Sequence, residues 1–357
     1  MSKFWSSIVT RTEPYIPGEQ INDPSIIKLN TNENPYPPSD SVENAIKDEL
    51  GGNLKRYPSP TVDSLRETIA ENYHVGKESI FVGNGSDEIL GFSFMAFFEP
   101  GKTIRFPNIS YSFYPVYAKL FNIPFDEVNV NSDFSLDPSA FFESDGGVIF
   151  PNPNAPTGIL LSLSAVESII VQNRNQVVII DEAYIDFARE TAVPLVAKYP
   201  NLLVIQTTSK SRSLAGLRVG YAIGHPDLIE GLNRIKNSFN SYTLDRLAIV
   251  GANAALLDKS YYEAITRKII QTREWISKEL TQLGFHVLPS QANFVFASHK
   301  KVTAINLYTL LKQNGILVRH FNQEPIDNYL RITIGSNTEM KLFMERLKRI
   351  LRKNTHL

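Results

Sequence analysis

A short stretch after an apolar run carries an unusual group of polar side chains. Residues 207–221 read TTSKSRSLAGLRVGY and follow the apolar segment LLVI. Hydroxyl groups lie on both sides of Lys210, an arginine follows at position 212, and a second arginine, Arg218, comes eight residues after the lysine. A lysine amine can form a Schiff base with an aldehyde, and a guanidinium together with hydroxyl groups can hold a phosphate. The alternative from this stretch alone is a basic surface loop with a glycine turn.

Carboxyl groups follow two other apolar runs. DEAY begins at Asp181 directly after VVII, and NGSDE begins at Asn84 after IFVG. A carboxylate at the end of a buried strand needs a cation or hydrogen-bond donors, unless it caps the next turn. Gly85 allows close backbone approach, and the Ser-Asp-Glu after it fits the start of a helix, where free amide groups bind anions. The alternative for NGSDE is an ordinary helix cap.

One cofactor uses a lysine, a carboxylate, an anion pocket, an arginine and several hydroxyl groups together: pyridoxal 5'-phosphate. The lysine holds its aldehyde, and the carboxylate keeps the pyridine nitrogen protonated so that the ring accepts electrons from a substrate carbanion. A phenol near the ring oxygen tunes the imine, and Tyr184 is the candidate. An aromatic side chain covers the ring, and Tyr111 in NISYSFY follows the right kind of strand.

These side chains need elements that bring them together. Short apolar runs alternate with helical patterns through the middle of the chain, in the order SIFVG, TIRF, GVIF, VVII, LLVI and VGYAIG. This alternation predicts an α/β fold with a mostly parallel sheet covered on both faces by helices. Ligands of such sheets bind beyond the carboxyl ends of the strands, where the polar residues described above fall.

The length of 357 residues predicts two domains. We expect a large cofactor-binding domain at residues 51–243 and a smaller α+β domain at residues 244–357. The last helical segment, NTEMKLFMERLKRILRK, places apolar residues on one face, which we interpret as core. Residues 1–50 are rich in Pro and Asn, and we expect them to form an arm that joins the small domain or covers the site.

The composition excludes several classes of protein. A formal net charge of −1 gives no support for binding nucleic acid or a membrane surface through bulk charge. The absence of cysteine excludes disulfides and thiolate chemistry, and the six histidines have no paired spacing, so we expect no metal site. The N-terminal residues lack the apolar core of a signal peptide, and no stretch approaches a membrane span, so we expect a cytoplasmic protein.

The stretch around Lys210 resembles the cofactor-lysine signature of fold-type I aminotransferases, the aspartate aminotransferase superfamily. The segments NGSDE, NPNAPTG and DEAY are similar to other motifs of that superfamily in the same order. Within it, the segments LNTNENPYPP, KRYPSP, ANFVF and YLRITIG resemble the histidinol-phosphate aminotransferase branch. The similarity runs from about Pro14 to Arg352, nearly the whole chain.

The resemblance implies a role for each matching residue at the cofactor ring. Lys210 would hold the aldehyde and move the proton between the substrate α-carbon and the cofactor. Asp181 would pair with the ring nitrogen, Tyr184 would bond the ring oxygen, and Tyr111 would stack on the ring.

The resemblance also implies residues for the cofactor phosphate, the substrate and a second subunit. The phosphate would be held by Gly85, Ser86, Asp87, Thr207, Ser209 and Arg218. Tyr57 would reach the cofactor phosphate of a neighbouring subunit, which implies a homodimer with shared sites. Arg331 would bind the anionic end of the substrate, and the other candidates for substrate contacts are Tyr15, Asn34, Asn293 and Arg319.

Two positions depart from the pattern of the superfamily. The asparagine expected directly before PTG is replaced by Ala155, so Asn154 or Asn152 would bond the ring oxygen instead, or Tyr184 would act alone. Many relatives carry an aromatic residue two positions after the lysine, where this chain has Arg212. We interpret Arg212 as a solvated loop charge, with a phosphate contact as the alternative.

The implied reaction is the reversible transfer of an amino group between L-histidinol phosphate and 2-oxoglutarate, a step of histidine biosynthesis. Its products are imidazole-acetol phosphate and L-glutamate. Two alternatives share the same cofactor motifs: an aminotransferase for aromatic or broader amino acids, and a lyase similar to threonine-phosphate decarboxylase. An effector-binding module of a transcription regulator would need an added helix-turn-helix domain, for which the chain has no spare length or basic segment.

Overall fold

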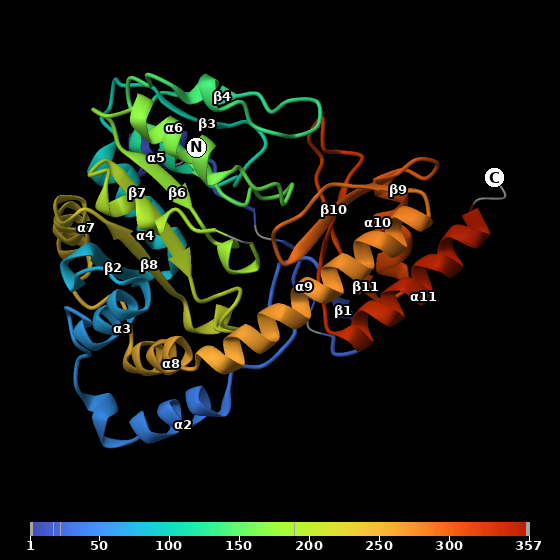
Figure 1. Ribbon diagram of the computed structural model, residues 1–357, viewed down its shortest axis with the longest axis horizontal. Coiled ribbons are helices and arrows are strands. Elements are labelled where there is room, and N and C mark those ends of the chain that lie inside the picture. Colours follow the sequence, from blue (N-terminus) through green and yellow to red (C-terminus); the bar gives the residue numbers. More distant parts are fainter. Residues whose placement is uncertain (1–2, 17, 22, 189, 355–357) are drawn as a thin grey trace.

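The computed structural model describes residues 3–16, 18–21, 23–188 and 190–354. Figure 1 shows a larger and a smaller body, joined by the long helix α9 (Lys259–Gln282), which runs from one into the other. No helix in the described parts of the chain is both long and apolar enough to cross a membrane.

A seven-stranded sheet forms the centre of the larger body. Its order is β2-β8-β7-β6-β5-β3-β4, and β8 runs antiparallel to both of its neighbours while the other adjacent pairs are parallel. The strands are β2 (Ile80–Asn84), β3 (Ile104–Pro107), β4 (Phe125–Val128), β5 (Val148–Pro151), β6 (Val178–Asp181), β7 (Leu202–Thr207) and β8 (Val219–Gly224). This confirms the mostly parallel sheet that the alternating apolar runs predict.

Helices cover both faces of this sheet. They are α3 (Asp63–Tyr73), α4 (Gly85–Phe97), α5 (Tyr114–Phe121), α6 (Leu163–Gln172), α7 (Pro226–Phe239) and α8 (Arg246–Leu257), and α2 (Asp40–Glu49) packs on α8. Ile180 and Phe150 lie in a core that includes residues of α3, α6 and α8. Ile179 and Ile149, their neighbours along the strands, lie in a second core with α4, α5 and α7. The strands are apolar throughout because successive side chains enter opposite cores.

The smaller body contains a four-stranded antiparallel sheet in the order β12-β13-β10-β9. Its strands are β9 (Phe285–Val287), β10 (Phe294–His299), β12 (Arg319–His320) and β13 (Leu330–Thr333), and its helices besides α9 are α10 (Ala304–Gln313) and α11 (Asn337–Asn354). The apolar face of α11 is buried, as expected, through Met340, Phe343, Met344, Leu347, Ile350 and Leu351.

The N-terminal segment contacts both bodies. The short helix α1 (Ser7–Arg11) lies beside α5, while β1 (Ile27–Lys28) pairs in parallel with β11 (Ile316–Leu317) of the smaller body. Short 3-10 helices complete the chain: η1 (Gly52–Lys55), η2 (Lys77–Ser79), η3 (Pro138–Phe141), η4 (Ile185–Phe187), η5 (Val193–Ala197) and η6 (Ala215–Leu217). The domain limits at residues 50 and 243 stay predictions; α8, which follows residue 243, packs into the core of the larger body.

Candidate active site

A cavity of about 110 Å³ lies at the carboxyl ends of the central strands. Nine of the residues that the sequence nominates line it: Ser86, Asp87, Tyr111, Asp181, Tyr184, Thr207, Ser209, Lys210 and Arg218. Pro151, Ala155 and Ala183 complete the lining. They meet here because β2, β5, β6 and β7 all run in the same direction, so the residues that follow these strands gather at one edge of the sheet.

Lys210 lies in the loop after β7, and its amine points into the cavity. The amine donates a hydrogen bond to the Thr31 carbonyl at 3.3 Å and lies 5.9 Å from the centre of the Tyr184 ring. Burial, and next the positive charge of Arg331, lower the pKa of Lys210 to about 8. A larger fraction of neutral amine is therefore available at physiological pH than in an exposed lysine, which suits attack on an aldehyde.

Asp181 is the last residue of β6 and is buried. Its carboxylate accepts hydrogen bonds from the Ala183 amide and the Tyr114 hydroxyl, each at 3.1 Å. Burial raises the pKa of Asp181 to about 6, because neither hydrogen-bond partner is a cation. A protonated ring nitrogen would supply the missing positive charge. Tyr114 was not nominated from the sequence, although it lies three residues after Tyr111.

Tyr184 is held by an asparagine from the N-terminal segment. The Asn32 side-chain amide donates to the Tyr184 hydroxyl at 2.9 Å. Asn32 is fixed in turn by Asn293, whose amide donates to its carbonyl at 3.0 Å, and by the Thr333 hydroxyl. Burial raises the pKa of Tyr184, so its hydroxyl remains a hydrogen-bond donor. Asn32 was missed in the sequence because its partner lies 152 positions away.

The two asparagines nominated for substrate contacts, Asn34 and Asn293, act through neighbours. Asn293 supports Asn32, as described above. Asn34 donates its side-chain amide to the backbone carbonyls of Lys210 and Ser211 at 3.0 and 3.2 Å. Both therefore position the cavity-lining residues in this structure.

The part of the cavity beside the start of α4 offers hydrogen-bond donors for an anion. The amide groups at the start of α4 open onto it, and Gly85 has a φ of 80° that favours glycine. A Cβ atom at Gly85 would lie 2.6 Å from Arg218 Nη2, so the guanidinium needs this glycine to approach the helix. The hydroxyls of Thr207 and Ser209 lie 3.0 Å apart beside it.

Asp87 orients two neighbours with one carboxylate. Its oxygens accept hydrogen bonds from Arg218 Nη2 at 3.1 Å and from the Tyr111 hydroxyl at 2.7 Å. A carboxylate would repel a phosphate, so the contribution of Asp87 to an anion site comes from its backbone amide and from holding Arg218.

A wider cavity of about 630 Å³ adjoins the first, since Tyr111 lines both. Tyr15 and Arg319 contribute to its walls. The Tyr15 ring lies 4.3 Å from the Phe113 ring, and the Arg319 guanidinium lies 5.5 Å from the Phe321 ring.

Arg331 is a half-buried cation with spare donors. Its Nη2 donates to the Asn30 carbonyl at 2.8 Å, and its buried Nε has no hydrogen-bond partner among the described residues. The guanidinium lies 5.5 Å from the Phe294 ring and 5.7 Å from the Phe321 ring. Burial lowers the pKa of Arg331, and an anionic ligand would restore a favourable environment.

Two residues nominated for the cofactor, Asn154 and Tyr57, make their contacts elsewhere in this chain. The Asn154 amide donates to the Ile109 carbonyl and to the Thr157 hydroxyl, and Ala155 lines the cavity instead. Tyr57 is 78% exposed and stacks on Tyr242 at 4.7 Å. Its contact with a neighbouring subunit stays a prediction.

The position of Arg212 agrees with neither of the two interpretations from the sequence, a solvated charge or a phosphate contact. Its guanidinium lies 3.5 Å from the centre of the Tyr262 ring and donates to the Ala255 carbonyl at 3.0 Å. The interpretation as a solvated charge was wrong, because the side chain packs on α9 and its Nε is buried. Arg212 also does not line the cavity.

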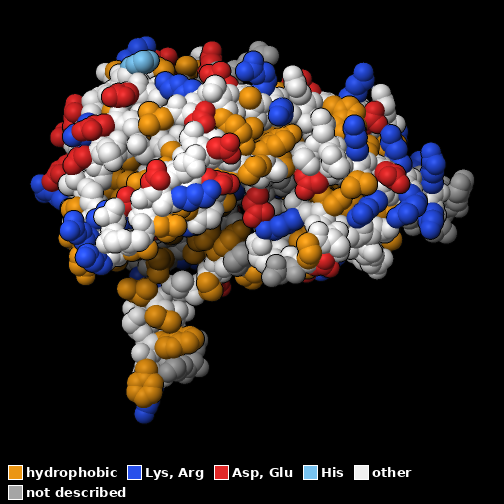
Figure 2. Space-filling model, turned by 90° about the horizontal axis from the view of Figure 1, so that it is seen from below, with side chains coloured by type: hydrophobic (Ala, Val, Ile, Leu, Met, Phe, Trp, Pro, Cys, Tyr) orange, Lys and Arg blue, Asp and Glu red, His pale blue; other side chains and the backbone are white. Residues whose placement is uncertain are grey.

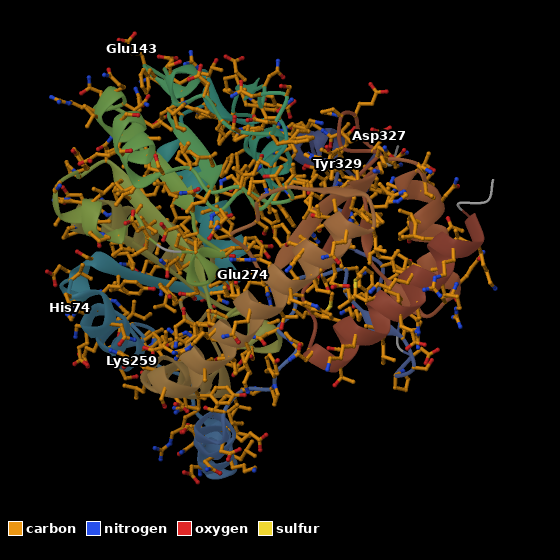
Figure 3. The ribbon with its side chains drawn as sticks, turned by 45° about the vertical axis from the view of Figure 1, so that its right-hand side comes forward. His74, Glu143, Lys259, Glu274, Asp327 and Tyr329 are labelled. Carbon is orange, nitrogen blue, oxygen red and sulfur yellow. The ribbon has the colours of Figure 1, made fainter. Side chains whose placement is uncertain are left out.

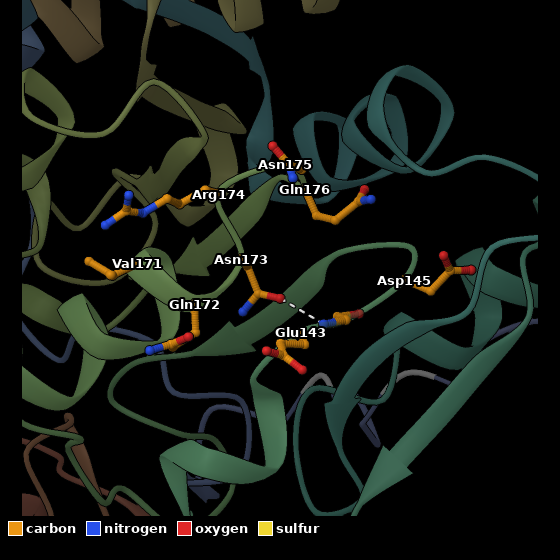
Figure 4. A pocket seen from close by; sticks show the side chains of 9 residues that line it. Glu143, Asp145, Val171, Gln172, Asn173, Arg174, Asn175 and Gln176 are labelled. Atoms are coloured by element: carbon orange, nitrogen blue, oxygen red, sulfur yellow. Dashed lines mark hydrogen bonds between the residues drawn. The ribbon is translucent and has the colours of Figure 1, made fainter.

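A further hollow of about 530 Å³ lies at the amino ends of β5 and β6 (Figure 4). Asn173 in its wall accepts from the Ser144 amide at 2.9 Å and donates to the Phe141 and Ile169 carbonyls. These contacts hold two loops together, so we assign no chemistry to this hollow.

The sequence matches one family over most of its length. Residues 24–347 match the family described as aminotransferase class I and II. A protein of Oceanobacillus iheyensis named histidinol-phosphate aminotransferase 1 is 59% identical over 352 residues, which cover 99% of each chain. A histidinol-phosphate aminotransferase of Clostridium acetobutylicum is 57% identical over 348 residues, which cover 98% of this chain and 99% of the relative.

Solved structures share the fold. The histidinol-phosphate aminotransferase from Clostridium acetobutylicum superposes with a TM-score of 0.84 at 25% identity, over 92% of this chain and all of the other. The enzyme of that name from Sinorhizobium meliloti, solved in complex with pyridoxal-5'-phosphate, has a TM-score of 0.88 at 22% identity and 99% coverage of both chains.

Proposed function

The chain belongs to the aminotransferase class I and II family, and from this membership we propose that it transfers an amino group between L-histidinol phosphate and 2-oxoglutarate. The products are imidazole-acetol phosphate and L-glutamate, and the reaction belongs to histidine biosynthesis. The half-buried guanidinium of Arg331, with its unpartnered Nε, is the observation that carries the choice of substrates. It has spare donors for one oxyanion, and both the phosphate and the carboxylate accept parallel N–H bonds.

The cavity fits pyridoxal 5'-phosphate. It combines an amine of lowered pKa, a buried carboxylate without a paired cation and a cluster of amide, hydroxyl and guanidinium donors. The phosphate would lie against the first turn of α4, with Ser86, Thr207, Ser209 and Arg218 as its side-chain donors. When bound, the cofactor withdraws electrons from the substrate α-carbon.

Each side chain around the ring has its own task. The Lys210 amine would hold the aldehyde and then move the proton at the substrate α-carbon, since its lowered pKa lets it accept a proton near neutral pH. Asp181 would keep the proton on the ring nitrogen. Tyr184, held by Asn32, would donate to the ring oxygen, and this arrangement replaces the asparagine that is missing at Ala155. Tyr111 would cover the ring.

The wider cavity would receive the remainder of the substrate. Tyr15 and Arg319 line it. Arg331, whose charge acts on Lys210 although it lines neither cavity, would bind the phosphate of histidinol phosphate or the carboxylate of glutamate.

A homodimer with shared sites is part of this proposal. Large hydrophobic side chains are exposed around α2 and the end of α7, namely Leu50, Leu54, Tyr57, Phe239 and Tyr242. Figure 2 shows further hydrophobic side chains along a narrow projection, and the described N-terminal residues Phe4, Trp5, Ile8 and Val9 are exposed. Burial of these groups against a second copy would stabilise a dimer. The cytoplasmic location stays a prediction from the sequence.

Half-reactions with separate amino donors test the choice of substrate. The holoenzyme is mixed with histidinol phosphate, glutamate, phenylalanine or threonine phosphate, and the cofactor spectrum and the products are followed. We expect amino transfer from histidinol phosphate and from glutamate. Faster transfer from phenylalanine would indicate an aromatic or broad-specificity aminotransferase, and release of carbon dioxide from threonine phosphate would indicate a lyase.

A further inference from the structure

The short segment from Lys210 to Arg212 is held by hydrogen bonds with three other parts of the chain. Asn34 donates to the carbonyls of Lys210 and Ser211. The Ser211 hydroxyl, which is buried, donates to the Asp186 carboxylate. Arg212 donates to the Ala255 carbonyl at the end of α8. The sequence gives no sign of these contacts, because the residues involved are far apart in the chain.

Asp186 belongs to the segment that carries two residues of the cavity. It lies in η4, five positions after Asp181 and two after Tyr184. Its bond to Ser211 therefore ties the segment that would contact the ring nitrogen and ring oxygen to the segment that carries the reacting amine. A shift of either segment would change the distance between Lys210 and the ring.

The charge of the same carboxylate also acts on Tyr262, in the first turn of α9. Its charge and a hydrogen bond contribute to the raised pKa of Tyr262, after the larger effect of burial, while the charge of Arg212 acts in the opposite direction. The Arg212 guanidinium lies against the Tyr262 ring at 3.5 Å. An anion, a cation and a phenol thus meet beside the Lys210 loop, and each has a partner in this group.

Tyr262 lies at the end of α9 that borders the larger body. Figure 3 labels Lys259 at the beginning of this helix and Glu274 further along its path toward the smaller body. The neighbouring Tyr261 hydroxyl donates to the Pro37 carbonyl, so the N-terminal segment is fixed to the same turn. The contact of Arg212 with Tyr262 therefore connects the lysine loop to the helix that joins the two bodies.

We propose that Asp186, Ser211, Arg212 and Tyr262 form a clamp that sets the position of Lys210 relative to Asp181 and to the start of α9. The inference rests on the proposed role of Lys210 as the reacting amine. All four are positioning residues, because none of them lines the cavity. Displacement of a reacting group by about 1 Å lowers rates by up to about 100-fold, so the clamp contributes to the rate without touching the substrate.

Hydrogen exchange of the apoprotein tests the clamp without any substrate. The variants are Arg212→Met and Asp186→Ala, and Arg234→Met, which loses only an exposed ion pair with Glu230, is the matched control. We expect the amides of residues 208–214 to exchange about tenfold faster in both clamp variants and at the original rate in the control. Arg212→Lys keeps a cation over Tyr262 and should restore most of the protection.

Two rates complete the experiment. Capture of pyridoxal phosphate by the apoprotein should slow about tenfold in the clamp variants, and kcat with the best of the four donors should fall about 10- to 100-fold with little change in KM. Folded variants with unchanged exchange, or with faster exchange but unchanged capture and kcat, would overturn the proposal. If a variant fails to fold, Ser211→Ala provides the milder test. If histidinol phosphate is not the substrate, another of the four amino donors will react best in the half-reaction test. The hydrogen-exchange result does not depend on that outcome.

Discussion

Lys210 is half-buried, and the desolvation of its amine, together with the charge of Arg331, lowers its pKa to about 8. Only the neutral amine attacks an aldehyde, so its reactive fraction rises with pH until the pKa is passed. We expect the rate at which the apoprotein captures pyridoxal phosphate to rise with pH and to level off above about pH 8. Arg331→Gln should move the midpoint upward because a positive neighbour is removed, while Arg234→Gln should not. A rate that still rises toward pH 10.5 in the unmodified protein would contradict the burial of this amine.

Replacement of the amine itself separates binding from chemistry. Lys210→Ala leaves the donors for the cofactor phosphate intact, so some cofactor should stay bound. Amino transfer should fall by at least about 1000-fold, because both the anchor and the group that moves the proton are lost. Steady-state turnover and the cofactor content of the purified variant measure the two effects. Substantial turnover would assign the proton transfer to another group.

Asp181 has a distinct expected effect. Asp181→Ala should lower turnover roughly 100-fold and reduce cofactor affinity much less, because the ring nitrogen would lose its proton. Asp181→Glu, which keeps the charge, is the control and should be milder. Turnover near the original level in Asp181→Ala would leave Asp181 with only its structural bonds to the Ala183 amide and the Tyr114 hydroxyl, the role of a turn cap.

The ends of neighbouring strands are joined by a second buried carboxylate. Glu182 accepts hydrogen bonds from the Thr191 hydroxyl, the Ala192 amide and the Gln206 side-chain amide. Gln206 in turn accepts from the hydroxyls of Tyr73 and Tyr221. This network connects β6, β7 and β8 to α3 behind the residues that line the cavity.

Burial raises the pKa of Glu182 to about 7, above its ordinary value of 4.5. Between these values the folded protein holds a proton that the unfolded chain has released, so this group makes stability fall as pH rises through the window. Glu182→Gln cannot titrate. The free energy of unfolding of the variant, minus that of the unmodified protein, should therefore increase from pH 4.5 to 7 by up to about 3 kcal/mol. Urea unfolding at several pH values measures it, and a difference independent of pH would contradict the raised pKa.

Sequence patterns predict the sheet and the polar residues at its carboxyl edge. Contacts between segments that are far apart in the chain become visible only in the structure. The apolar runs and the motifs after them were sufficient to nominate nine cavity-lining residues, because parallel strands end at one edge. Asn32 and Tyr114 were missed, since each reaches its partner only after the N-terminal segment and α5 have packed. Arg212 was misinterpreted for the same reason: its partner Tyr262 lies on α9, fifty residues later.

The assembly of the whole molecule is tested by complementation. Tyr57 is exposed in one chain and is proposed to contact the cofactor phosphate of a second. Tyr57→Phe loses one hydrogen bond, about 1 to 2 kcal/mol, and should reduce activity at limiting cofactor. Mixed with Lys210→Ala, it should form heterodimers with one complete site and regain activity after refolding together. A monomer by sedimentation, or no recovery in verified heterodimers, would remove Tyr57 from the site.

The identity of the reacting amine is the claim on which the whole account depends. Borohydride treatment of the holoenzyme makes the linkage between amine and cofactor permanent, and peptide mapping then locates it. The account predicts a single pyridoxyl-labelled peptide, with the label on Lys210 in the loop after β7. A label on any other lysine, or no label, would contradict it.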